Sequence, residues 1–85
     1  MSNQYTKLNA AVDAFAVKMK AKLHKTCREG RKGWDNPTQF VRANIESGIV
    51  ACSTKIDAGD VAQAVDIANY AMFLDFNFAE EEGNG

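Results

Sequence analysis

The sequence predicts an all-α protein: three helices in an antiparallel bundle with a long first helix, completed as a larger bundle by homo-oligomerisation. In residues 3–29 and 37–56, apolar residues recur at steps of three and four, the spacing of an amphipathic helix. No segment shows the alternating pattern of a strand. The chain has 85 residues, enough for one domain, and 46% of them are apolar, which excludes wholesale disorder.

The first helix is predicted over residues 3–29, where neither glycine nor proline interrupts the chain. A helix of about 25 residues is roughly 37 Å long, which is more than a monomer of this size needs. We therefore expect a homo-oligomer, and specifically a dimer, because a short chain buries only a modest part of its surface by itself. The apolar stripe of this helix consists of Tyr5, Leu8, Val12, Phe15, Met19 and Leu23.

A second helix is predicted over residues 37–56, after a basic loop that contains two glycines. Asn36 is the expected N-cap, Pro37 suits the first helical position, and Gln39 stands where a capping box has Glu or Gln. Gly48 lies inside this helix at a cost of about 1 kcal/mol relative to alanine. An interior glycine of this kind often permits a neighbouring helix to approach closely.

The third helix is predicted from Val61 to residue 76 or 78, with Asp60 as its cap and Gln63 as the partner of that cap. It is apolar on nearly all sides, which indicates a central position. Residues 1–78 are therefore expected to form one helical domain. Residues 79–85 are acidic and glycine-rich and are expected to be a disordered tail.

Two polar residues, Asp66 and Asn69, stand three apart in this apolar helix and so share one face. We expect both to be buried. Burying an unpaired carboxylate is costly, so Asp66 should have a partner, such as a lysine or the ring N–H of Trp34.

Charge is unevenly distributed along the chain, although the formal net charge is only −1. Seven of the ten basic residues lie within residues 18–32, and seven of the eleven acidic residues lie within residues 57–82. The basic stretch is either a solvated helix face or a binding site for an anion or nucleotide. The residues proposed for such a site are Lys22, Lys25, Arg28, Arg31, Lys32 and Trp34, the last by stacking on a base or by plugging the end of the bundle.

Other features limit the classes of function and location. Duplex DNA is not an expected ligand, since a domain for that purpose is normally basic overall. No apolar run approaches the roughly 20 residues of a membrane span, and residues 1–7 lack the apolar core of a secretory signal, so a cytoplasmic location is predicted. Cys27 and Cys52 have no CxxC spacing and are expected to be reduced thiols.

Three segments carry a resemblance to a known family: residues 20–23 (KAKL), the basic loop leading to Gly33-Trp34, and residues 66–72 (DIANYAM). Together they resemble the MazG-like all-α nucleoside triphosphate pyrophosphohydrolases, and more closely the short phage and prophage proteins related to them, over residues 15–74. The resemblance implies an all-helical fold and, for a phage protein, the cytoplasm of the host cell. It also implies magnesium held by Glu-x-x-Glu on one helix and Glu-x-x-Asp on the next, with basic residues on the phosphates.

Only part of that carboxylate pattern is present. Asp66 matches the aspartate of the second pair, but Gln63 stands where its glutamate should be. Glu46 matches one member of the first pair, and Ile49 and Val50 occupy the positions three and four residues later. Because two carboxylates of the pattern are missing, we expect divalent ions to bind weakly.

The sequence therefore predicts a non-enzymatic small phage-type protein without a cofactor, which acts by binding a partner such as a host or defence protein. One alternative is a magnesium-dependent nucleotide pyrophosphohydrolase with Glu46 and Asp66 as metal ligands. The other is nucleotide binding without catalysis, through the basic stretch.

Overall fold

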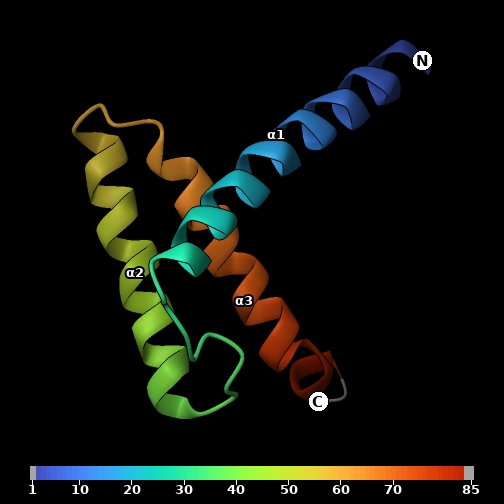
Figure 1. Cartoon of the computed structure of the whole chain (residues 1–85). Helices are drawn as coiled ribbons and strands as arrows, with labels where there is room; N and C mark the ends of the chain where they lie inside the picture. Colours follow the sequence, from blue (N-terminus) through green and yellow to red (C-terminus); the bar gives the residue numbers. More distant parts are fainter. Residues whose placement is uncertain (1, 84–85) are drawn as a thin grey trace.

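The computed structural model describes residues 2–83 of the chain, and the side chains of residues 3–79. Within that range the protein consists of three helices and no strand: α1 (Ser2–Arg28), α2 (Gln39–Asp57) and α3 (Gln63–Gly83) (Figure 1). The predicted three-helix, all-α class is confirmed.

Helices α2 and α3 are antiparallel neighbours joined by a short turn (Figure 1). The turn contains Gly59, whose φ of 108° lies in the left-handed region that glycine adopts without strain. The two helices are in close contact at Gly48 of α2. A Cβ atom at that position would lie 2.6 Å from Cζ of Tyr70 on α3, so the glycine makes room for the tyrosine ring.

Helix α3 is the central element, as the sequence predicts. It packs against both other helices, whereas α1 and α2 do not pack directly against each other within residues 2–83. The buried residues among the described side chains come from α2 and α3 alone: Ile45, Cys52, Asn69 and Phe78. The core is therefore small and lies between these two helices.

The C-terminal half of α1 crosses α3, and its N-terminal half extends away from the α2–α3 pair (Figure 1). The radius of gyration is 14.7 Å, against about 12 Å for a compact domain of this length. The apolar stripe of α1 is accordingly divided. Phe15, Met19 and Leu23 are partly covered, whereas Tyr5 and Leu8 are exposed.

The start of α2 differs from the prediction that Asn36 caps it. The N-cap is Thr38, which has an extended backbone and accepts a hydrogen bond at Oγ1 from the backbone N–H of Val41 (3.2 Å). The helix begins at Gln39, so Pro37 lies before it. Threonine is itself an N-cap residue, and here its hydroxyl satisfies a free N–H of the first turn.

Both ends of α3 also differ from the prediction. Val61 and residue 62 lie in a turn, and the helix begins at Gln63, whose side-chain amide donates to the Asp60 carboxylate (3.0 Å). At the other end α3 continues through residues 79–83, which we expected to be disordered. Three consecutive glutamates in this segment are good helix formers, which favours the extension. The last two residues of the expected tail, 84–85, lie outside the described residues.

Candidate functional site

An open hollow of about 430 Å³ lies where the end of α1 meets the α2–α3 pair. We call it the basic hollow. Its lining comes from all three helices and from the loop after α1. The lining residues are Lys22, Leu23, Lys25, Thr26, Glu29, Arg31, Lys32, Cys52, Lys55, Gln63, Asp66, Asn69, Tyr70 and Phe73.

Local structure explains how the basic stretch reaches this hollow. Lys22 and Lys25 are three residues apart and share a face of α1. The helix ends at Arg28. Beyond it, the N–H of Gly30 (φ 82°) donates to the carbonyl of Cys27 (3.0 Å), and the N–H of Arg31 donates to that of Thr26 (3.2 Å). This is a Schellman motif. It reverses the chain so that residues 31–32 return to the hollow.

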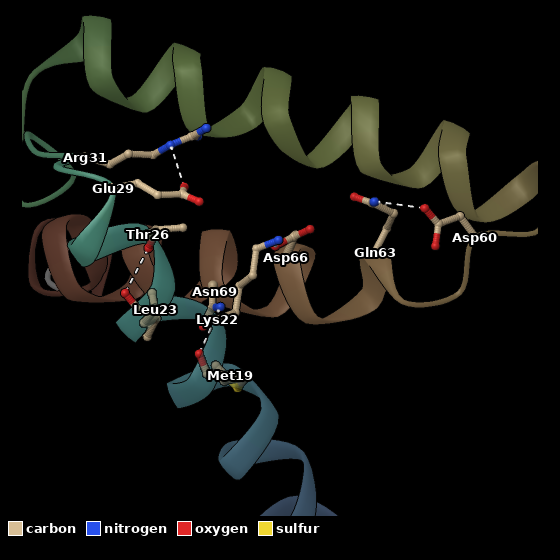
Figure 2. A network of polar contacts seen from close by, with 10 residues as sticks. All are labelled: Met19, Lys22, Leu23, Thr26, Glu29, Arg31, Asp60, Gln63, Asp66 and Asn69. Atoms are coloured by element: carbon tan, nitrogen blue, oxygen red, sulfur yellow. Dashed lines mark hydrogen bonds and ion pairs between the residues drawn. The ribbon is translucent and has the colours of Figure 1, made fainter.

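Positive charge dominates the basic hollow, although the whole chain has a net charge of −1. Five cationic and two acidic side chains line it. Nζ of Lys22 lies 3.4 Å from Oδ1 of Asp66, as Figure 2 shows, and Glu29 lies 3.8 Å from Arg31. The other three cations, Lys25, Lys32 and Lys55, form no ion pair with any described side chain. An anion entering the hollow would thus meet positive charge that the chain leaves uncompensated.

One wall of the hollow is apolar and aromatic. Leu23 of α1 and Tyr70 and Phe73 of α3 form it, with the two rings in an edge-to-face contact at 6.2 Å. Lysine and arginine stems also bring apolar surface to such a wall. The hollow therefore combines a charged rim with a surface suited to a flat apolar group.

Trp34 supports this wall from outside the hollow. Its ring stacks on Phe73 (4.9 Å between centroids, 28° between planes) and contacts Phe76 at 5.1 Å. Its carbonyl accepts a hydrogen bond from Nδ2 of Asn77 (2.7 Å). Trp34 thus fastens the loop to α3, in agreement with a tryptophan that plugs one end of the helices. It is not among the residues that line the hollow.

Asn69 is one of the residues that line the hollow and is only 5% exposed, as predicted for a buried polar residue. Its Nδ2 donates to the carbonyl of Met19 at 3.4 Å (Figure 2). That contact requires the nitrogen on the Met19 side, which leaves Oδ1 buried without a donor among the described residues. An unsatisfied buried acceptor costs about 1–3 kcal/mol of stability.

The two residues proposed as metal ligands do not converge. Oε2 of Glu46 lies 3.4 Å from Nε of Arg42 on α2, and Glu46 does not line the hollow. Asp66 is half-buried and has the predicted lysine partner, Lys22. No group of three or more His, Cys, Asp or Glu side chains that could hold a metal ion occurs among the described residues. Magnesium requires several oxygen ligands around one point, and these residues do not fit that requirement.

The structure brings together four of the six residues proposed for an anion site, namely Lys22, Lys25, Arg31 and Lys32. Arg28 does not line the hollow, because it lies about 120° around α1 from Lys22. The sequence reasoning missed Lys55 and the aromatic wall. The antiparallel pairing of α2 and α3 offered a signal for Lys55, since it brings the last turn of α2 beside the first turn of α3.

No family model, curated protein or solved structure matches the chain. The resemblance to MazG-like and phage proteins stays a prediction from residues 15–74. No helix within the described part of the chain is both long enough and apolar enough to cross a membrane.

Proposed function

We propose that the protein acts by binding rather than by catalysis, and that the basic hollow binds a small organic anion with a phosphate group and a flat ring, such as a nucleotide. One observation carries this proposal: five cationic side chains surround a hollow that also has an aromatic wall. Lysine and arginine donate charge-assisted hydrogen bonds to phosphate oxygens. Aromatic faces accept a stacked base with little dependence on its identity.

Size and polarity support the same class of ligand. A volume of about 430 Å³ lies within the range of small-molecule sites. The cations with no described ion pair, Lys25, Lys32 and Lys55, belong to α1, the loop and α2 respectively, so they would contact a phosphate group from different sides.

Catalysis is not proposed, because neither acidic residue expected to hold a metal ion for phosphoryl transfer is available in the hollow. Asp66 pairs with Lys22, and Glu46 pairs with Arg42 away from the hollow. Recognition of a host or defence protein, which the family resemblance implies, stays a separate prediction with no described surface assigned to it.

Isothermal titration calorimetry of the full chain with AMP, ADP, ATP, adenosine and inorganic phosphate tests the proposal. We expect each nucleotide to bind more tightly than adenosine or phosphate alone, and higher salt to weaken binding. Lys55→Gln should weaken nucleotide binding about fivefold, which corresponds to about 1 kcal/mol. Lys7→Gln is the matched control, since Lys7 is an exposed lysine at the far end of α1. Absence of nucleotide binding at millimolar concentrations, or an unchanged affinity in Lys55→Gln, would contradict the proposal.

Asp66→Asn separates anion binding from metal-dependent hydrolysis. The substitution removes a negative charge from the hollow and releases Lys22, so nucleotide affinity should rise a few-fold. A magnesium-dependent pyrophosphohydrolase would instead lose activity. Release of pyrophosphate by the wild-type protein with magnesium, abolished in Asp66→Asn, would overturn the assignment of the protein as non-enzymatic.

A further inference from the structure

The solvent-accessible area of the chain is larger than the average for folded monomeric proteins of the same mass. Its accessible area is 6585 Å². A folded monomeric protein of 9.3 kDa exposes about 5,000 Å² on average. The excess is about 1,600 Å², and a standard protein interface removes about 800 Å² from each partner. The surface left uncovered is thus large enough for a stable interface.

Part of this excess lies on the N-terminal half of α1, residues 3–15, which we call the α1 arm. Three apolar side chains follow one face of it, and their exposed fractions are 69% for Tyr5, 57% for Leu8 and 64% for Val12. Phe15 continues the same face and is partly covered. The arm extends away from the α2–α3 pair (Figure 1), and most of a helix's stability in a protein comes from packing of its apolar face, so covering this face would stabilise the arm.

We propose that the partner is a second copy of the chain, and that two α1 arms pair antiparallel in a two-fold symmetric dimer. The apolar positions are spaced three, four and three residues apart, which is the a/d spacing of a two-helix coiled coil. Antiparallel pairing centred on residue 10 sets Leu8 of one copy beside the partner's Val12. The same register sets Tyr5 beside the partner's Phe15. Each of the four apolar side chains of one arm is thus covered by an apolar side chain of the other arm.

Charge favours this occupant and this orientation. The positions that flank the stripe, Gln4, Asn9, Ala11 and Ala16, carry no charge, so a second identical arm meets no repulsion there. A parallel pair would set the basic stretches 18–32 of both copies side by side. The antiparallel pair places them at opposite ends of the dimer, where their repulsion is weakest.

Light scattering after size-exclusion chromatography, over a range of protein concentrations, measures the assembly. We expect the wild-type mass to be twice 9.3 kDa and the double variant Leu8→Gln/Val12→Gln to have the single-chain mass. These side chains are exposed in the single chain, so the core between α2 and α3 stays intact, as cooperative unfolding of the variant would verify. Val17→Gln is the matched control. Val17 is 67% exposed on a different face of α1, so this variant should remain a dimer.

Disulfide cross-linking in a Cys27→Ser background determines the orientation. Ala11→Cys should cross-link readily, because residue 11 faces its symmetry mate near the two-fold axis. Gln4→Cys should not, because an antiparallel pair centred on residue 10 separates the two copies of residue 4 by roughly 18 Å along the helix. A wild-type protein that stays monomeric at all concentrations, as expected if a different protein covers the arm, would overturn the proposal. A dimer that survives the double substitution, or equal cross-linking through residues 4 and 11, would do the same.

Discussion

Replacing Gly48 by alanine should destabilise the protein, even though alanine is the better helix former. The new Cβ would lie 2.6 Å from Cζ, 2.8 Å from Cε2 and 3.0 Å from the hydroxyl oxygen of Tyr70. These distances are well below the contact distance of about 3.5–4.0 Å at which carbon atoms attract one another. The tyrosine ring has little freedom to move, because its edge contacts Phe73, which is itself stacked under Trp34.

The magnitude follows from two opposing terms. Alanine gains about 1 kcal/mol in helix propensity over glycine. Overpacking a helix–helix contact costs about 1–3 kcal/mol. The expected net effect of Gly48→Ala is a loss of about 1 kcal/mol in the free energy of unfolding. With a urea m-value of about 1 kcal/mol/M for a chain this small, the unfolding midpoint should fall by about 1 M.

Urea unfolding followed by circular dichroism at one fixed protein concentration is the assay, since self-association would make stability depend on concentration. Ser47→Ala, at the exposed neighbouring position, is the control and should raise stability by up to about 0.5 kcal/mol. In a Tyr70→Ala background the clash is absent, and Gly48→Ala should then stabilise by about 1 kcal/mol. If Gly48→Ala stabilises the wild-type chain as much as it stabilises Tyr70→Ala, the close contact between α2 and α3 does not exist as described.

Three further substitutions test other contacts by the same unfolding assay. Thr38→Ala should lower the free energy of unfolding by about 1 kcal/mol, because it removes the N-cap of α2. Asn36→Ala should lower it by less than about 0.5 kcal/mol. If Asn36→Ala has the larger effect, Asn36 is the N-cap and the helix starts there. Trp34→Ala should lower the free energy of unfolding by about 2 kcal/mol, because it removes the stack on Phe73, and Trp34→Phe should lower it by less. If Trp34→Ala is as stable as the wild-type protein, the loop is not fastened to α3. Asn69→Leu should raise the free energy of unfolding by about 1 kcal/mol by removing the unpaired Oδ1. A large loss of stability would show that this oxygen has a donor.

Helix number and approximate position were predictable from the sequence, because each depends on local periodicity and on turn residues. The stripe that begins at Tyr5 predicts α1 to within a residue at each end. The start of α2 was not predictable in the same way. Asn36 and Thr38 are both acceptable caps, and the choice depends on backbone geometry that no residue type alone specifies.

How far α1 overlaps α3 was also beyond the sequence. The stripe is continuous from Tyr5 to Leu23, so its spacing does not reveal that only the half nearer Leu23 packs on α3. The crossing instead follows from tertiary contacts, such as the Lys22–Asp66 ion pair and the hydrogen bond from Asn69 to Met19. A local pattern reports which face of a helix is apolar, and not what covers it.

The site was predictable where its residues are close in sequence. Lys22, Lys25, Arg31 and Lys32 stand within eleven consecutive positions, and a single helix end followed by a tight turn is enough to gather them. Lys55 reaches the hollow only through the register of α2 against α3, and that register depends on non-local packing at Gly48. Such a residue carries no signal in its immediate sequence.

The two halves of α1 have different chemistry, so the proposed ligand binding and the proposed self-association involve different residues. The α1 arm holds one lysine and one aspartate, Lys7 and Asp13, and one face of it exposes apolar side chains. The other half brings Lys22 and Lys25 to the basic hollow. Val12 lies about 15 Å along the helix from Lys22, beyond the Debye length of about 8 Å at physiological salt. When a ligand and a second chain contact no common residue and no common movable element, the coupling free energy between their two binding events should be near zero.

The monomeric variant Leu8→Gln/Val12→Gln should therefore bind nucleotide within twofold of the wild-type affinity. A larger change would mean that the partner chain reaches the hollow, and that the pairing of two arms is not the whole interface.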